Sequence, residues 1–275
     1  MLNNICSDNE ELHPLVSIIM PSYNSEKFIL KAIASVTSQS YSKWELFVVD
    51  GGSNDSTFRL VKNITRFETR ITIVDNKDDC GPAHARSVGV KLSRGCFIAF
   101  LDADDLWLPD KLSQQVSFML KNNYSFSYTG YRRLSKFGKL GCLVPMADSY
   151  SYSRYLARRG IGCLTTMIKR SLLTDDVIGV WRRSGGEETL WWLLILKKGV
   201  VAHLLNIDLA RYRDTAGSLS QNQIHTVKTV WSYYRNELNI SSLQLIWVFP
   251  QYLVDAAVRK IRLIVCLRFQ SIKAA

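Results

Sequence analysis

Three aspartates near the middle of the chain are the residues best suited to chemistry. Asp102, Asp104 and Asp105 directly follow a short apolar run, residues 97–101, which has the pattern of a buried strand. Carboxylates in such a place are costly without a counter-charge, and a divalent cation that also binds phosphate oxygens would supply one. The segment is therefore a candidate metal–diphosphate site. The alternative is a solvated acidic turn that caps the helix expected from Pro109 onward.

The elements that would position these acids alternate along the first half of the sequence. Apolar runs predict strands at residues 16–20, 46–49, 71–74 and 97–101. Helical patterns cover residues 26–38, 56–67 and 82–93. This alternation predicts an α/β fold with a mostly parallel, Rossmann-like sheet flanked by helices. Ligands of such sheets bind beyond the carboxyl ends of the strands, where polar segments at 21–24, 50–53 and 102–105 would meet.

The alternation lapses beyond about residue 124. Further strands are predicted at residues 124–131, 139–144 and 164–168, and helices at about 187–198, 222–238 and 242–270. The sequence contains no internal repeat and no Gly/Ser-rich linker. We therefore expect one catalytic domain, residues 1–240, followed by a basic helical extension, residues 241–275.

Composition narrows the classes of partner. With 275 residues, of which 47% are hydrophobic and 21% charged, the chain has the composition of a folded protein rather than a disordered one. Its formal net charge of +11 indicates an anionic partner, such as a nucleotide or an anionic membrane surface. No RNP-like strand or zinc-finger spacing is present, so no nucleic-acid partner is expected.

Cysteine usage and the chain's apolar stretches predict a cytoplasmic, soluble or peripheral protein. Six cysteines lie far apart without a C-x-x-C pair, which favours reduced thiols over a disulfide framework. The first residues are polar and acidic, unlike a signal peptide. The longest uncharged stretch, residues 240–254, is interrupted by Pro250 and is too short to span a bilayer.

Two further segments could contact the same ligand as the aspartates. Asp50, at the end of a predicted strand, begins a Gly-rich turn where its carboxylate could accept hydrogen bonds from a base or ribose. The alternative is an ordinary strand-to-helix turn. Arg86, on the next predicted helix, could make a forked contact with a diphosphate, or could be a solvated arginine.

Taken in order, these segments closely resemble the family 2 inverting glycosyltransferases of GT-A fold. The segments of the first half are PLVSIIMPSYNSEKF (14–28), ELFVVDGGSNDST (45–57), GPAHARSVG (81–89) and FIAFLDADDLWLPDKLSQQ (97–115). The second half resembles the teichuronic-acid and O-antigen type members, in the segments IGCLTTMIKR (161–170), EETLWWLLILKKG (187–199) and LARYRDTAGSLSQN (209–222). The resemblance covers roughly residues 14–240.

The resemblance implies a nucleoside-diphosphate-sugar donor, with a UDP-sugar favoured, and Mn²⁺ or Mg²⁺ as cofactor. Asp104 would be the direct metal ligand. Asp102 would reach the ribose and belong to the metal site. Asp105 would not bind the metal directly but would support the other two acids. Gly51 stands where a second acid is common, which leaves Asp50 as the acid at that strand end. The residues assigned in this way to the donor are Pro21, Ser22, Tyr23, Asp50, Arg86, Asp102, Arg211 and Arg213.

The catalytic base implied by the resemblance lies at the start of a predicted helix. Trp192 follows Glu188 by four residues, as in the family pattern, so Glu188 aligns with the base and Glu187 is the second candidate. The alternative is a first-turn acid pair that the helix dipole favours. Trp191 and Trp192 would point to different faces of the helix, one of them to the sugar site and the other to the core.

A basic segment after the predicted helix resembles the family's lid. It contains Arg211, Arg213 and Ser218, and the resemblance implies a flexible cover over the donor diphosphate. The alternative is an exposed basic loop.

The C-terminal segment has the pattern of a basic amphipathic helix. Residues 254–269 interleave apolar residues with four basic ones, opposed only by Asp255. These basic residues are Arg259, Lys260, Arg262 and Arg268. Such a helix suits the anionic inner face of a membrane. An ordinary packing helix or a contact between copies of the chain is the alternative, so a homo-oligomer stays open.

Together these features predict a metal-dependent inverting glycosyltransferase on the cytoplasmic face of the cell membrane. It would transfer a sugar to a hydroxyl of a polyprenyl-diphosphate-linked acceptor, as in O-antigen-like polysaccharide biosynthesis. Two alternatives are a nucleotidyltransferase, which lacks a Gly-rich Lys/Arg signature here, and a nucleotide-sugar-binding scaffold subunit impaired in catalysis.

Overall fold

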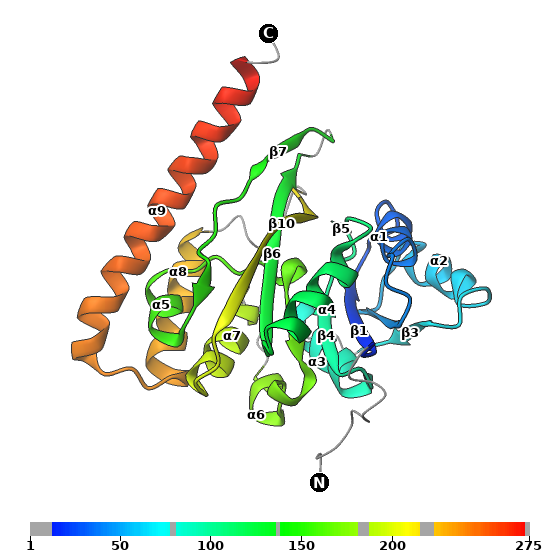
Figure 1. The fold of residues 1–275 in the computed structure, drawn as a ribbon, viewed down its shortest axis with the longest axis horizontal. Coiled ribbons are helices and arrows are strands. Elements are labelled where there is room, and N and C mark those ends of the chain that lie inside the picture. The colour runs from blue at the N-terminus through cyan, green and yellow to red at the C-terminus, as the bar shows by residue number, and fades with distance from the viewer. Residues whose placement is uncertain (1–12, 78–80, 136–137, 181–186, 215–222, 273–275) are drawn as a thin grey trace.

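A single mixed sheet runs through the described part of the chain and carries the predicted site (Figure 1). The computed structural model describes residues 13–77, 81–135, 138–180, 187–214 and 223–272; at Glu187 and at several positions of the last two helices only the backbone is described. The strands are β1 (Val16–Ser22), β2 (Trp44–Asp50), β3 (Ile71–Asp75), β4 (Phe97–Phe100), β5 (Leu106–Trp107), β6 (Phe126–Leu134), β7 (Leu140–Leu143), β8 (Ser149–Tyr150), β9 (Met167–Lys169) and β10 (Ala202–Arg213). The helices are α1 (Ile29–Thr37), α2 (Thr57–Ile64), α3 (Pro82–Leu92), α4 (Lys111–Lys121), α5 (Tyr152–Ala157), α6 (Asp175–Ile178), α7 (Glu187–Lys197), α8 (Gln223–Ser232) and α9 (Ser242–Ile272).

The sheet order is β3-β2-β1-β4-β9-β6-β10-β5, with β7 on β6 and β8 on β10. The first four strands are parallel, as predicted, and Ser22 and Asp50 end level with each other in the register of β1 and β2. The second half mixes directions, because β9 runs antiparallel between β4 and β6 while β10 runs parallel to β6. The predicted α/β class is confirmed, with an antiparallel component in its second half.

Helices cover both faces of this sheet because the central strands bury side chains on both sides. Ile19 of β1 joins a core with α3, α5 and α7, whereas Ile18 and Met20 join a second core with α1, α2 and α4. All seven residues of β1 and of β2 are buried. Strands buried on both faces read as continuous apolar runs, which is why these strands could be located from the sequence.

β10 is the longest strand and was not predicted. Its residues pair with β6 through two register shifts, between Leu205 and Asp208 and between Asp208 and Ala210. Such bulges interrupt the two-residue period that identifies a strand in a sequence. The short helices α5 and α6 were also not predicted.

α9 lies along the side of the molecule opposite α2 and β3, and it packs inward through Leu245 and Tyr252 (Figure 1). Within the described residues, no helix is both long and apolar enough to cross a bilayer. The prediction of reduced thiols is confirmed for Cys163, which is buried and free, and is wrong for Cys96 and Cys142, which are disulfide-bonded.

Candidate functional site

The acidic turn lies at the carboxyl end of the parallel strands, directly after β4. Asp105 donates its backbone N–H to the carbonyl oxygen of Asp102 at 3.0 Å, which bends the chain between β4 and β5. Ala103 is buried beneath the turn, while Asp102 and Asp104 are partly exposed. The turn therefore presents two accessible carboxylates at the edge where the sequence predicted a ligand.

Asp105 points inward and is fixed by β10. Its Oδ1 accepts the backbone N–H of Arg213 at 2.8 Å, whereas its Oδ2 is buried without a hydrogen-bond partner. Arg213 also donates from Nε to the carbonyl oxygen of Asp104 at 2.8 Å. Burial, together with the charges of Asp102 and Asp104, raises the pKa of Asp105 well above its ordinary value. Three acids are thus crowded at a point where a cation would relieve their repulsion.

Arg86 binds Asp102 from the buried side of the turn. Its Nη2 donates to Asp102 Oδ1 at 2.5 Å, and the arginine side chain is only 6% exposed. The helix that carries it lies close to β1 because Gly89 has no side chain: a Cβ there would stand 2.5 Å from Ile19 Cγ2. Since Arg86 is buried and ion-paired, the alternative of a solvated arginine is wrong.

The same arginine also interacts electrostatically with the predicted base, Glu188. Burial works against its charge, yet its pKa lies above the ordinary value because Asp102, Cys163 and Glu188 act on it. Glu188 lies half-buried in the first turn of α7 and acts on the Tyr155 phenol as well. The structure therefore brings together two acids, at positions 102 and 188, that are far apart in the sequence. The side chain of Glu187 lies outside the described residues.

Asp50 organises the loop at the end of β2. It is 1% exposed, and its Oδ1 accepts hydrogen bonds from Ser22 Oγ at 3.0 Å and Ser53 Oγ at 2.6 Å, while its Oδ2 accepts the Ser53 backbone N–H at 2.9 Å. These contacts tie the ends of β1 and β2 together. Pro21 is buried within β1, and Tyr23 projects from the same edge with 56% of its surface exposed.

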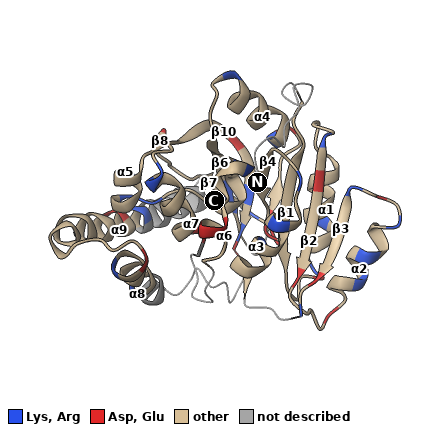
Figure 2. Ribbon diagram, turned by 90° about the horizontal axis from the view of Figure 1, so that it is seen from below, with Lys and Arg blue, Asp and Glu red and all other residues tan. Residues whose placement is uncertain are grey.

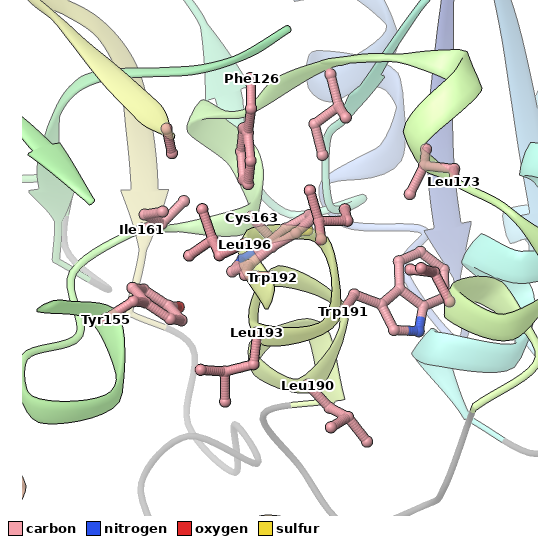
Figure 3. Packing of buried hydrophobic residues seen from close by; sticks show 14 of the residues in the cluster. Phe126, Tyr155, Ile161, Cys163, Leu173, Leu190, Trp191, Trp192, Leu193 and Leu196 are labelled. Carbon is pink, nitrogen blue, oxygen red and sulfur yellow. The ribbon is translucent and has the colours of Figure 1, made fainter. Parts of the chain in front are cut away.

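The two tryptophans of α7 point to different sides of the helix, as predicted (Figure 3). Both are buried, and neither lines a sugar site: Trp191 donates from Nε1 to the carbonyl oxygen of Val180 at 3.1 Å, and Trp192 packs on Phe126 with ring centroids 5.3 Å apart. The expectation that one indole reaches the sugar is therefore wrong. Instead, they seat α7 in the core and so fix the position of Glu188.

Comparison with known proteins agrees with this geometry. The family model "Glycosyl transferase family 2" matches residues 17–140. A putative teichuronic acid biosynthesis glycosyltransferase, TuaG of Bacillus subtilis, is 34% identical over 90% of this chain and 98% of its own length. The chain belongs to glycosyl transferase family 2. The glucosyltransferase WfgD of Escherichia coli, named UDP-Glc:alpha-D-GlcNAc-diphosphoundecaprenol beta-1,3-glucosyltransferase, is 38% identical over 79% of this chain and 84% of its own length.

Solved structures agree with the GT-A fold of this family 2 glycosyltransferase. TarS of S. aureus in complex with UDP-GlcNAc superposes with a TM-score of 0.64 at 20% identity, covering 81% of this chain and 67% of that one. The mannosyltransferase PcManGT of Pyrobaculum calidifontis, in complex with GDP-Man and Mn2+, gives 0.64 at 17% identity, covering 95% and 81%. At these identities the likeness concerns the fold alone.

Two arginines of the family 2 enzyme belong to a strand and not to the lid that the resemblance implied. Arg211 and Arg213 belong to β10, so they form part of the sheet and not a flexible lid; Ser218 lies outside the described residues. Arg211 donates from Nη1 to Asp208 Oδ1 at 2.5 Å, and Arg132 donates from Nε to the other oxygen of Asp208 at 2.7 Å. Sequence reasoning missed Asp208, whose only signal was its spacing of three residues before Arg211.

The acidic turn has the donor atoms that Mn²⁺ or Mg²⁺ prefers. Asp102 and Asp104 offer carboxylate oxygens, which suit hard cations, and Asp105 fixes the turn to β10 behind them. In the part of the chain that the structure describes, no three His, Cys, Asp or Glu residues are grouped to hold a metal ion by themselves. The turn therefore fits a cation that takes further ligands from a bound diphosphate.

Proposed function

We propose that this glycosyltransferase moves a sugar from a nucleoside diphosphate to a hydroxyl of a lipid-linked polysaccharide acceptor, with inversion at the anomeric carbon. The observation that supports the proposal is the buried guanidinium of Arg86, which binds Asp102 and interacts electrostatically with Glu188. A donor-side acid and a candidate base thereby lie at one edge of the sheet. Both groups must be near the donor, because in an inverting reaction the base acts on the side of the anomeric carbon opposite the departing diphosphate.

The donor side of the proposed site is the edge formed by β1, β2 and β4. A UDP-sugar would bind there, supported by the fold shared with TarS, whose complex contains UDP-GlcNAc. Asp104 and Asp102 would hold Mn²⁺ or Mg²⁺, which when bound supplies positive charge to the departing diphosphate. The proposed donor contacts of this chain are Pro21, Ser22, Tyr23, Asp50, Arg86, Asp102, Arg211 and Arg213.

Glu188 is the proposed base, with Glu187 as the second candidate. Its carboxylate takes the proton of the acceptor hydroxyl while the hydroxyl oxygen forms a bond to the anomeric carbon. The bond from that carbon to the diphosphate oxygen breaks, and the electron pair leaves with the diphosphate. Arg86 would position this machinery through its hydrogen bond to Asp102 and its electrostatic interaction with Glu188.

The acceptor side is inferred from the relatives. WfgD and WfaP of Escherichia coli carry names that specify an acceptor linked to diphosphoundecaprenol. We infer that this chain uses a comparable polyprenyl-diphosphate-linked acceptor and acts at the inner face of the cell membrane. Residues 1–240 would form the catalytic unit, and residues 241–275 its extension.

A scaffold subunit that binds the donor without turning it over is the alternative, because a glutamate stands at the position of the base. The test is to incubate the purified chain with Mn²⁺, a panel of UDP-sugars and a diphosphoundecaprenol-linked GlcNAc, and to analyse the lipid product by mass spectrometry and its anomeric configuration by NMR. A β-linked product from an α-configured donor supports the proposal. Donor binding without product, across the panel, would favour the scaffold.

A further inference from the structure

One face of α9 is apolar and exposed along most of the described helix. Its residues recur every three or four positions, which places them on a single side of the helix. Leu243 is 76% exposed, Trp247 74% and Ile261 60%. The exposed residues of this face, called here the outer face of α9, are Leu243, Ile246, Trp247, Pro250, Val254, Ala257, Val258 and Ile261.

The outer face is not needed for packing within the chain. The opposite side of α9 is the one that joins the core: Leu245 and Tyr252 are each 3% exposed, and Phe249 packs against Tyr252 with ring centroids 5.8 Å apart. α9 is thus apolar on both sides. A continuous apolar surface in water marks a contact with another apolar partner.

The charge of α9 identifies the kind of partner. Its 31 residues contain four basic residues and one acidic residue, Asp255. That acid is already neutralised, because its Oδ2 lies 2.9 Å from Nε of Arg259. The whole chain carries a net charge of +11. Apolar side chains combined with an excess of basic ones suit the interface of an anionic bilayer.

We propose that the outer face of α9 binds the interfacial layer of an anionic membrane, with the helix axis parallel to the bilayer surface. This inference rests on the proposed function, which requires the enzyme to meet a lipid-linked acceptor. From Leu243 to Ile261 the helix is about 27 Å long. Its apolar side chains would enter the boundary between headgroups and acyl chains.

Contact with a second copy of the chain is the competing use of this face. A helix pair through this face would have to include Trp247 and Pro250 in its seam. An indole is large for the holes of a two-helix seam, which are filled by residues such as Leu and Ile. Tryptophan is instead enriched at bilayer interfaces, where its ring meets the headgroups. The composition of the outer face therefore favours the membrane.

α9 and the acidic turn have an electrostatic neighbour in common, Tyr131 of β6. Burial raises the pKa of Tyr131 to about 12, and the same phenol is acted on by Arg259 of α9 and by Asp105 of the acidic turn. With its outer face on the bilayer, α9 would keep the enzyme at the surface that carries its membrane-linked acceptor.

The test is sedimentation of the full chain with vesicles of phosphatidylcholine alone or mixed equally with phosphatidylglycerol. We expect binding to the anionic vesicles and at least about a tenfold weaker partition for the double variant Leu243→Ser, Trp247→Ser, because each side chain removed contributes apolar area. The matched control is Phe67→Ser, which removes a side chain that is 90% exposed on the far side of the molecule. It should bind as the unaltered chain does.

Three results would overturn the inference: no binding of the unaltered chain to anionic vesicles, equal binding of the double variant, or a dimer in light scattering that the double variant abolishes. Transfer to a short-chain, water-soluble acceptor separates this inference from the proposed function. The double variant should keep that transfer while losing vesicle binding. A chain that binds vesicles through α9 but transfers no sugar would refute the proposed function and leave the membrane contact standing.

Discussion

Arg86 Nη2 lies 2.5 Å from Asp102 Oδ1, and this ion pair is the centre of the site. The arginine side chain is 6% exposed, whereas the aspartate is 30% exposed. The pair therefore has a buried, fixed end and an end that faces the ligand edge of the sheet. Glu188 also acts electrostatically on this guanidinium, so one buried cation links the proposed donor-side acid and the proposed base.

The first prediction concerns this cation. Arg86→Gln should lower kcat/KM roughly a hundredfold or more, because Asp102 loses its fixed orientation and a displacement of about 1 Å suffices for such a loss. Arg86→Lys, which keeps the charge but not the fork, should recover part of the activity. The control is Arg94→Gln, since Arg94 pairs with Glu45 at 3.2 Å from an 80% exposed position. Equal activity of the Arg86 and Arg94 variants, with melting temperatures matched, would contradict the assignment.

The second prediction distinguishes the two candidate bases. Glu188→Gln should lower kcat by about 10²–10⁴-fold with little change in donor affinity, because the amide cannot accept the acceptor's proton. Glu187→Gln should retain most activity. Steady-state kinetics, together with calorimetric titration of the donor, measure both quantities. The reverse order of effects would assign the base to Glu187.

The parts of this site that could be predicted are those that depend on residues close together in the sequence. The strand ends at Ser22, Asp50 and Asp102 were predicted because their strands are continuous apolar runs. The ion pair between Arg86 and Asp102 was not predicted, since its formation depends on how closely α3 approaches β1. That approach is set by Gly89 and Ile19, which are 70 residues apart in the sequence.

The second half of the fold was harder to predict for a related reason. The bulges of β10 around Asp208 disturb its alternation, so Arg211 and Arg213 were interpreted as a lid and not as strand residues. The burial of Trp191 and Trp192 on α7 likewise depends on Phe100 of β4 and Phe126 of β6. In each case the missing information was a pairing between distant segments.

The third prediction concerns the metal. Asp104→Asn should abolish most transfer in Mn²⁺ and should reduce the Mn²⁺-dependent rise in melting temperature that UDP produces, because a bound ligand stabilises the folded state. Asp175→Asn is the matched control, since Asp175 is an exposed acid of α6, next to Asp176, which pairs with Lys198 just after the C-terminal end of α7. Full activity of the chain in EDTA, after removal of metal has been verified, would count against a cation at the turn.

The fourth prediction concerns Lys111, a fully buried lysine in α4. Burial lowers its pKa well below the ordinary value, although its Nζ reaches the carbonyl oxygen of Thr166 at 3.4 Å and lies 3.8 Å from the Trp107 ring centre. Between this lowered pKa and the ordinary lysine pKa of about 10.4, the unfolded chain binds a proton that the folded chain does not. The free energy of unfolding therefore falls as the pH falls below about 10.4. Lys111→Met should raise the free energy of unfolding at pH 7 by roughly 1–3 kcal/mol, with a smaller gain near pH 10. Urea titrations at both pH values measure this; a loss of stability at pH 7 would show that the charged amine is satisfied in the fold.

The last prediction connects packing to chemistry through Gly89. Gly89→Ala places a Cβ 2.5 Å from Ile19 Cγ2, so α3 must move away from β1 and carry Arg86 with it. We expect a loss of about 1–3 kcal/mol in stability, typical of an overpacked core, and a fall in kcat/KM larger than that of a surface variant of equal stability. The double variant Gly89→Ala, Ile19→Ala removes the obstructing methyl groups and should restore activity more than stability, because it also leaves a cavity. Activity that follows the melting temperature alone, with no recovery in the double variant, would mean that α3 does not set the position of Arg86.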